Sequence, residues 1–350
     1  MSRIERLAAL LDEPLLVTSK GDVRFNVRYL TGLSSSNAAL LVEPDGEATL
    51  FTDFRYAQKA RALEGVRFEQ TARAVIPDLA TRLSGKTIGI ESHVLAVAER
   101  EQLQEGGVET ISRTGLVERL RAIKEPEELD AIRAAAAVSD KMFASLAGEQ
   151  FTGRTEVELA WRVRELFHEH GASQLSFDTI VAAAENGASP HADTRDVPIP
   201  PNTLVTVDAG CRVDGYISDC TRTFATGDLP DELRRAYDVC LEAQLAGLAA
   251  FGPGKTGRDV DAAAREVIAA AGWAEQFGHG LGHGMGLEVH EAPTVRAEST
   301  DTLEAGNVVS CEPGIYLPGV GGVRIEDMVL VTDSGAERLT HAGKELTTVR

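Results

Sequence analysis

Two aspartates, Asp208 and Asp219, lie eleven positions apart on either side of a turn signal. That signal is Asp214-Gly215, a dipeptide that favours a two-residue hairpin because both residues can take positive φ. With this turn, Gly210 pairs with Asp219, and Asp208 faces the same side of the sheet as Gly210. The two carboxylates would then be diagonal neighbours, roughly 7–8 Å apart at the backbone. They repel unless a metal ion or a pair of ions lies between them. A solvated hairpin is the alternative.

Histidines gather in the glycine-rich stretch FGHGLGHGMGLEVHE, which holds His279, His283 and His290 at spacings of four and seven. Glycines let the backbone pass close to a ligand or to another strand. A lone histidine is more often a core or surface residue than a ligand. Three of the chain's eight histidines within twelve residues indicate a functional role for at least one of them.

Glu312 and Glu326 fall in the last two apolar runs of the chain. A glutamate is costly to bury unless it is paired or bound to a metal, so each one alone would be a surface residue. Together with the two aspartates, four carboxylates would balance two divalent ions. One imidazole completes a mixed oxygen and nitrogen set that suits manganese, iron, cobalt or zinc. Such a pair of ions makes water a strong nucleophile at neutral pH.

The elements that must position these residues divide into two predicted domains. Residues 1–121 alternate between helix and strand, typical of an α/β domain, and carry no charged set with catalytic spacing, so we interpret them as a lid or dimerisation domain. Glu125-Pro126-Glu127 marks the start of a long helix and the boundary. Residues 122–350 mix helices and strands and predict an α+β domain. The patterns predict helices over 2–13, 54–63, 155–170, 229–254 and 257–273, and strands over 15–20, 86–92, 307–318 and 321–331, with a hairpin over 37–53.

Composition narrows the function. The 350 residues favour two domains, and 43% hydrophobic residues suffice for a core. A net charge of −19 argues against a nucleic-acid partner, because phosphate binding needs a positive surface. We expect no signal peptide and no membrane span, since no run of 18 or more apolar residues occurs. Four cysteines without C-x-x-C spacing predict reduced, partly buried thiols and a cytoplasmic location.

The ordered metal-ligand candidates resemble those of the dinuclear metallopeptidases of the pita-bread fold, family M24B. The more specific resemblance is to its Xaa-Pro aminopeptidases (aminopeptidase P) and Xaa-Pro dipeptidases (prolidases), and it covers nearly the whole chain. An N-terminal domain of the creatinase type is indicated by VRYLTGLSSSNAALLV and TDFRYAQKA, and RAIKEPEELDAIRAA resembles the interdomain junction. The metal motifs follow in order as VDAG, YISDCTRTF, GHGLGHGMGLEVHE, EPGIY and GVRIEDMVLV. Any one motif is weak, but the ordered set is specific.

The resemblance implies a role for each matching residue. The metal ligands would be Asp208, Asp219, His283, Glu312 and Glu326, holding two divalent ions, with manganese expected and cobalt, zinc or iron as alternatives. Glu312 would also move the proton, and His191 and His290 would orient the substrate and stabilise the tetrahedral intermediate. Substrate-side or supporting positions would be Phe177 in the proline pocket, His279, Tyr316 and Arg324. Ordinary alternatives are a core Phe177 and a surface ion pair for Arg324.

One departure from the dipeptidase pattern bears on substrate length. Dipeptidases of this branch often read HExPR, and their arginine is thought to hold the dipeptide carboxylate. This chain reads HEAPT, with Thr294 at that place and Arg296 two residues on. We therefore expect an Xaa-Pro aminopeptidase that accepts longer peptides with proline second.

Other functions stay open. An Xaa-Pro dipeptidase is the main alternative. Methionine aminopeptidases generally lack a first domain of this kind. Creatinase-like hydrolases and non-catalytic peptide-binding members usually lack the five ligands. A homodimer is expected, with no nucleic acid or membrane partner.

Overall fold

The computed structural model describes residues 1–20 and 25–350. The chain separates into two compact units, Met1–Arg121 and Ala122–Arg350. Among the helices in these described ranges, none is both long enough and apolar enough to cross a membrane. Each unit is described by itself below.

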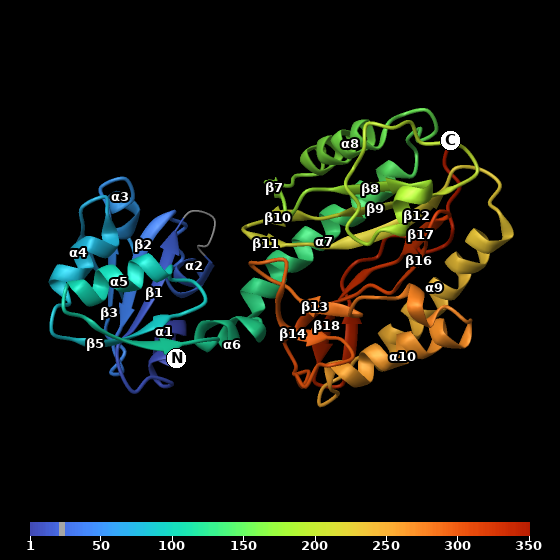
Figure 1. Cartoon of the computed structure of the whole chain (residues 1–350). Coiled ribbons are helices and arrows are strands. Elements are labelled where there is room, and N and C mark those ends of the chain that lie inside the picture. Colours follow the sequence, from blue (N-terminus) through green and yellow to red (C-terminus); the bar gives the residue numbers. More distant parts are fainter. Residues whose placement is uncertain (21–24) are drawn as a thin grey trace. The chain divides into compact units, whose positions relative to one another are not determined.

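The first unit is a six-stranded mixed sheet with helices packed against it (Figure 1). The strand order is β4-β3-β2-β1-β5-β6; β2 runs antiparallel to β1 and β3, and the other neighbours are parallel. Its strands are β1 Leu15–Lys20, β2 Asn37–Val42, β3 Ala48–Thr52, β4 Arg67–Gln70, β5 Thr87–Glu91 and β6 Glu109–Arg113. Its helices are α1 Arg3–Ala8, α2 Phe25–Thr31, α3 Ala57–Ala60, α4 Val75–Arg82, α5 Val97–Glu105 and α6 Leu116–Ala122, the last of which crosses the boundary.

Local sequence signals predict the hairpin of the first unit correctly, but they predict two helices that are longer than those in the structure. Pro44-Asp45-Gly46 joins β2 to β3, and Gly46 takes φ +92° while its N–H donates to the Glu43 carbonyl. Because positive φ costs glycine nothing, the predicted turn forms. The helices predicted over 2–13 and 54–63 are shorter than expected, at α1 and α3.

The second unit begins with a long helix whose start was predicted. Glu125 is the N-cap of α7, Pro126 is its first residue, and the Glu128 carboxylate accepts from the Glu125 N–H. Thr155 caps α8 in the same reciprocal way with Glu158. The helices are α7 Pro126–Leu146, α8 Glu156–Glu169, α9 Asp231–Ala250 and α10 Gly257–Ala270, with short 3-10 turns η1 Ala184–Ala188 and η2 Ala274–Gln276.

The strands of the second unit form four small sheets. Their orders are β11-β10-β7, β12-β9-β8, β14-β13-β15-β18-β19 and β16-β17. The first strands are β7 Gln174–Leu175, β8 Ile180–Ala183, β9 Leu204–Ala209, β10 Cys211–Val213, β11 Tyr216–Ile217 and β12 Cys220–Ala225. The later strands are β13 Gly282–Gly284, β14 Glu291–Val295, β15 Val308–Cys311, β16 Gly314–Leu317, β17 Gly321–Arg324, β18 Asp327–Thr332 and β19 Gly335–Arg338.

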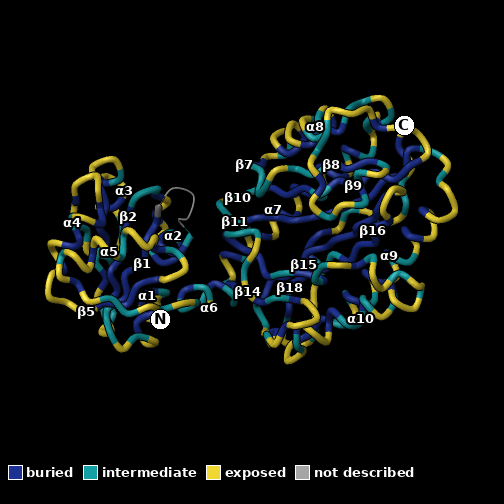
Figure 2. The backbone as a smooth tube through the Cα atoms, viewed as in Figure 1, coloured by how far each residue is buried: buried dark blue, intermediate teal, exposed yellow. Residues whose placement is uncertain are grey.

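Two larger apolar cores and a smaller one stabilise this second unit. One larger core packs α7 and α8 against β8, β9 and β12, with Phe151, Phe167 and Val207 fully or almost fully buried. The other larger core packs α9 and α10 against the strands from β13 to β18. Figure 2 shows the buried backbone running through the strands, whereas the outer faces of α8, α9 and α10 are exposed. The strands between the two helix pairs are therefore packed on both sides.

The prediction of two continuous strands over 307–318 and 321–331 is wrong, because each run breaks at its glutamate. At Glu312-Pro313 the chain leaves β15, which pairs with β18, and enters β16, which pairs with β17. Pro313 cannot donate to a ladder, so the break falls there. The second run breaks before β18, where the N–H of Glu326 bonds to the Thr221 carbonyl instead of a ladder partner. Both glutamates thus lie where the chain changes sheets.

Candidate functional site

The predicted hairpin forms with the predicted register. Asp214 and Gly215 take φ of +48° and +85°, and Val213 pairs with Tyr216. The same register continues beyond Gly210, where Asp208 pairs with Thr221. A Cβ at Gly210 would lie 2.0 Å from the Ser218 carbonyl oxygen, so only glycine fits there. This close approach brings Asp208, on β9, near Asp219, which directly precedes β12.

An acidic cluster with one histidine lies at this close approach. Asp219, His283 and Glu326 each offer a ligand atom, and these atoms all lie within 4.8 Å of one another. The Nε2 atom of His283 is 3.3 Å from Oε1 of Glu312 and 4.0 Å from Oδ2 of Asp219. Asp219 and Glu326 are almost fully buried. Residues far apart in the sequence therefore converge on one small volume.

The electrostatics of this cluster favour the binding of a positive charge. Burial and then the charge of Asp208 raise the pKa of Asp219 well above its usual range. Burial and then the charge of Asp219 do the same to the pKa of Glu326. The Oδ1 atom of Asp208 is buried and has no hydrogen-bond partner among the described residues. Carboxylates that repel one another, with an orphaned oxygen beside them, fit divalent cations with oxygen and nitrogen ligands.

Hydrogen bonds orient the side chains of His283 and Glu312. The Nδ1 atom of His283 lies 3.1 Å from the Gly284 carbonyl, an arrangement that leaves Nε2 facing the carboxylates. Ser310 accepts from the His283 N–H and donates its hydroxyl proton to Glu312. Burial opposes the charge on both side chains, but their mutual contact raises the pKa of His283 and lowers that of Glu312.

A buried hydrogen-bond chain links His279 to Asp208. The Nδ1–H of His279 donates to the Gly280 carbonyl, so Nε2 accepts from the Tyr316 hydroxyl at 2.8 Å. The Tyr316 oxygen accepts from Arg324, whose other Nη donates to Oδ2 of Asp208 at 2.8 Å. Burial lowers the pKa of His279 and raises that of Tyr316 to about 12. The predicted surface alternative for Arg324 is wrong, because its side chain is 4% exposed.

His191 and His290 are both exposed. The His290 ring centroid is 4.3 Å from that of His283. Burial and then the charge of His283 lower the pKa of His290, and the charge of His191 adds to this effect. The His191 charge also contributes, after burial, to the lowered pKa of His279. These imidazoles therefore share one environment.

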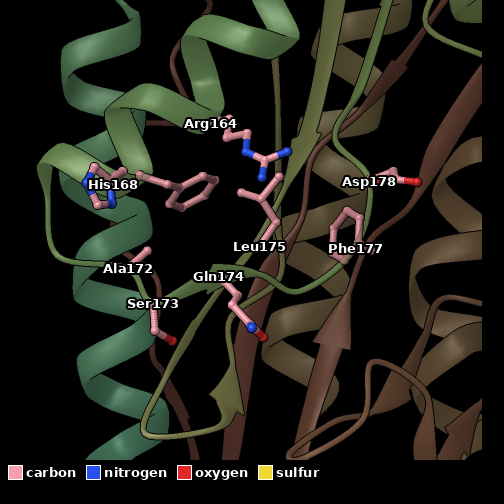
Figure 3. Close-up of a pocket in the computed structure, with 9 residues that line it drawn as sticks. Arg164, His168, Ala172, Ser173, Gln174, Leu175, Phe177 and Asp178 are labelled. Carbon is pink, nitrogen blue, oxygen red and sulfur yellow. The ribbon is translucent and has the colours of Figure 1, made fainter. Parts of the chain in front are cut away.

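Phe177 lies between β7 and β8 and lines a cavity of about 600 Å³ (Figure 3). None of the five predicted metal ligands lines this cavity. Its other walls are Arg164, Phe167, His168, Ala172, Ser173, Gln174, Leu175 and Asp178. The assignment of Phe177 to a proline pocket stays a prediction.

The sequence analysis did not single out two residues, Thr221 and Ser310, that orient the acidic side chains. Thr221 donates its hydroxyl proton to Glu326 at 2.8 Å, and Ser310 links His283 to Glu312. Both are ordinary strand residues. Only their positions in the sequence, Thr221 just after Asp219 and Ser310 just before Glu312, indicate a role in the site. In the first unit, Glu91, His93 and Glu118 also converge, although nothing in their spacing indicated it.

Comparison with known proteins places this arrangement in a family. Residues 130–333 match the model of metallopeptidase family M24, and residues 3–123 match the creatinase/prolidase N-terminal domain. The chain is 34% identical to an Xaa-Pro dipeptidase of Pyrococcus furiosus over 349 residues, which cover 98% of this chain and 99% of the relative.

Two solved structures extend the comparison over both units. An Xaa-Pro dipeptidase from Bacillus anthracis matches with a TM-score of 0.94 and 36% identity over 99% of each chain. An X-Pro aminopeptidase from Thermotoga maritima MSB8 matches with a TM-score of 0.90 and 29% identity over 98% of this chain and 100% of that one. The predicted fold class, a pita-bread domain preceded by a smaller creatinase-type domain, is confirmed. The chain belongs to metallopeptidase family M24.

Proposed function

We propose that the chain is an Xaa-Pro dipeptidase, which cleaves dipeptides with proline second. The observation that carries the proposal is the convergence of Asp219, His283 and Glu326 within 4.8 Å, with the ring of the exposed His290 against that of His283. Our expectation of an aminopeptidase rested on Thr294 alone. The Xaa-Pro dipeptidases among the relatives, at 34% and 36% identity, favour the dipeptidase over it.

The donor set would hold two divalent ions, with manganese as the first candidate. Asp219 and His283 would act with Glu312 and Glu326 as ligands. Asp208 would join them through Oδ1, the oxygen left without a partner among the described residues. The chemistry that such a pair supplies when bound is Lewis-acid polarisation of a carbonyl and activation of water.

The chain's own residues would transfer the proton and stabilise the developing negative charge. Glu312 would take a proton from the attacking water and deliver it to the proline nitrogen, with Ser310 fixing the carboxylate by its hydrogen bond at 3.1 Å. His290 and His191 would donate to the substrate carbonyl oxygen as negative charge develops there. Proline contributes a tertiary amide without N–H, so recognition must come from shape and from the leaving residue's carboxylate.

The surroundings of Thr294 bear on that carboxylate. Its N–H and hydroxyl both donate to Oδ2 of Asp301, at 2.8 and 2.9 Å. An anion beside this position makes it a poor place for a substrate carboxylate. A dipeptidase would therefore need its cation elsewhere, and Arg296 is an exposed arginine nearby whose guanidinium has no partner among the described residues.

Matched peptides test the proposal. Hydrolysis of Xaa-Pro, Xaa-Pro-Yaa and the control Xaa-Ala would be measured with manganese, cobalt and zinc in turn. We expect the highest kcat/KM for Xaa-Pro, and loss of activity with chelator. Preference for the tripeptide would instead identify an Xaa-Pro aminopeptidase, which the Thermotoga maritima neighbour keeps as the second candidate. No cleavage before proline with any metal would contradict both.

Three further expectations belong to this proposal. All four cysteines are buried and free, which fits a reducing, cytoplasmic setting. We expect residues 1–121 to serve as an N-terminal domain of a homodimer. The peptidase domain would comprise residues 122–350, with small proline-containing peptides as its partners.

A further inference from the structure

A buried glutamate lies at the base of the loop that carries His191. Glu156 is the first residue of α8, and its side chain is 1% exposed. Its carboxylate accepts from the Ala183 N–H at 2.9 Å, from the Asn186 side chain at 2.9 Å and from the Arg195 N–H at 2.8 Å. These three donors lie on both sides of His191 in the sequence. One carboxylate therefore closes the loop from residue 183 to residue 195.

Other contacts leave little freedom in the same loop. The Asn186 amide also donates to the Asp193 carbonyl at 2.9 Å, and Arg324 donates to the Pro190 carbonyl at 3.2 Å. A Cβ at Gly322 would lie 2.0 Å from the Gly187 carbonyl oxygen, so the start of the loop packs directly on β17. The loop is thus held on one side by Arg324 and Gly322, next to the acidic cluster, and on the other side by Glu156.

The charge of Glu156 suits its place. The N-terminus of a helix favours a negative charge, and the carboxylate accepts hydrogen bonds without competing donors. The guanidinium of Arg195 lies 3.4 Å away from both carboxylate oxygens and is 34% exposed. Removal of this carboxylate would leave three donors without their acceptor. The Ala183 N–H is buried, and an unsatisfied buried donor commonly costs about 1–3 kcal/mol.

We propose that Glu156 is a positioning residue, which acts through His191 by holding the 183–195 loop against the site. The proposal rests on the proposed function, because His191 is taken to contact the substrate. Glu156 itself does not touch the cluster. Its effect on catalysis comes only from where it fixes His191, and a misplacement of about 1 Å at such a group can cost about 10²-fold in rate.

Glu156→Gln tests the proposal, because the amide keeps the shape but places an NH2 group against donors. We expect kcat/KM for Xaa-Pro to fall by about 10- to 100-fold, with normal metal content. The matched control is Glu185→Gln. Glu185 contacts the same Arg195 at 3.5 Å but is 70% exposed, so its removal should leave kcat/KM unchanged.

A double variant separates positioning from general stability. If Glu156 acts through His191, Glu156→Gln adds nothing in a His191→Ala background, since the loop then has no imidazole to place. Multiplied losses in the double variant would overturn the proposal. Should Glu156→Gln fail to fold, Asn186→Ala keeps the carboxylate and removes only the Asn186 amide with its two hydrogen bonds, to Glu156 and to the Asp193 carbonyl. It should give a smaller loss that also vanishes without His191.

Hydrogen exchange makes the outcome independent of the reaction. Amides in residues 184–195 should exchange faster in Glu156→Gln than in wild type or Glu185→Gln, and unchanged exchange would overturn the proposal. Wild-type protein that cleaves no proline peptide, together with faster exchange in the variant, would instead count against the proposed function alone.

Discussion

The ammonium nitrogen of Lys124 lies 3.3 Å from a carboxylate oxygen of Glu291, and the two side chains are 1% and 6% exposed. The other oxygen of Glu291 accepts from the N–H groups of Leu287 and Glu288. This ion pair therefore ties the start of the second unit to the turn that leads into His290. A Cβ at Gly286 would lie 3.0 Å from both side chains, so the pair has little room to rearrange.

Lys124→Met should lower the free energy of unfolding of the second unit by about 3–5 kcal/mol, because it removes the cation that lies 3.3 Å from a buried carboxylate. Both tryptophans, Trp161 and Trp273, lie in this unit, so urea unfolding followed by fluorescence reports on it. The control is Arg133→Met. This variant removes an ion pair between Arg133 and Glu337, whose side chains are 42% and 47% exposed. It should change the free energy of unfolding by less than about 1 kcal/mol. Equal effects would contradict the argument from burial.

Metal binding gives the second prediction. Asp219→Ala should abolish peptidase activity and lower the metal bound per chain, because it removes a charge from the centre of the acidic cluster. Elemental analysis of the loaded protein measures this. Asp214→Asn is the control, since asparagine also tolerates the positive φ of the turn. Full activity with normal metal content in Asp219→Ala would remove Asp219 from the ligand set.

The hairpin around these aspartates was predictable, whereas the sheet breaks were not. Turn chemistry is local, so Asp214-Gly215 determines its own conformation and the register that follows from it. An apolar run such as 307–318 is equally consistent with one strand or two. What decides is the partner strand, which changes at Glu312 and is supplied by distant residues.

Orienting residues are hidden from sequence analysis for the same reason. Glu156 looks like an ordinary acidic residue in a first helical turn, a place where such residues are common. Its function as an anchor appears only when the 183–195 loop folds over it. Arg324 is different, because the family resemblance named it as a supporting position, but its strand pattern gives no sign that it will be buried against Asp208. The order of the ligand candidates is readable in a sequence, whereas the contacts of their supporting residues are not.

His290 gives the third prediction. His290→Ala should reduce kcat on the order of 10²-fold, the scale for loss of a donor to a developing oxyanion. Metal content should remain normal, because His290 contacts the ring of His283 and is not proposed as a ligand. Steady-state kinetics and metal analysis on the same sample measure both. Loss of metal along with activity would show that His290 is itself a ligand.

Glu91 in the first unit gives a prediction about pH. Burial raises the pKa of Glu91 to about 7 from an ordinary 4.5, against the hydrogen bond from Asn26. At Glu91 the folded state therefore binds more protons than the unfolded state between these values, so the contribution of this residue to stability falls as pH rises from about 4.5 to about 7. The total change is about 3 kcal/mol by linkage.

Glu91→Gln should abolish that dependence, because glutamine resembles the protonated acid and does not titrate. Hydrogen exchange of β5, compared between wild type and variant at the same pH, cancels the intrinsic pH effect on exchange. Near pH 5, β5 should exchange as slowly in wild type as in Glu91→Gln, or more slowly. At pH 8, β5 should exchange more slowly in the variant. Glu64→Gln, at an exposed position, is the control. A constant difference across the range would contradict the raised pKa.

We expect the preference for substrate length to depend on Arg296. Because Asp301 occupies both donors of Thr294, the exposed guanidinium of Arg296 is the candidate partner for the carboxylate of a dipeptide. Arg296→Ala should raise KM for Xaa-Pro by about 10- to 100-fold, the value of a hydrogen bond to a charged group. KM for Xaa-Pro-NH2, which has no carboxylate, should not change. Arg234→Ala removes an exposed arginine from α9 and should affect neither peptide. Equal losses for the two peptides would show that Arg296 does not bind the carboxylate, and the cation would then have to be sought in another part of the chain.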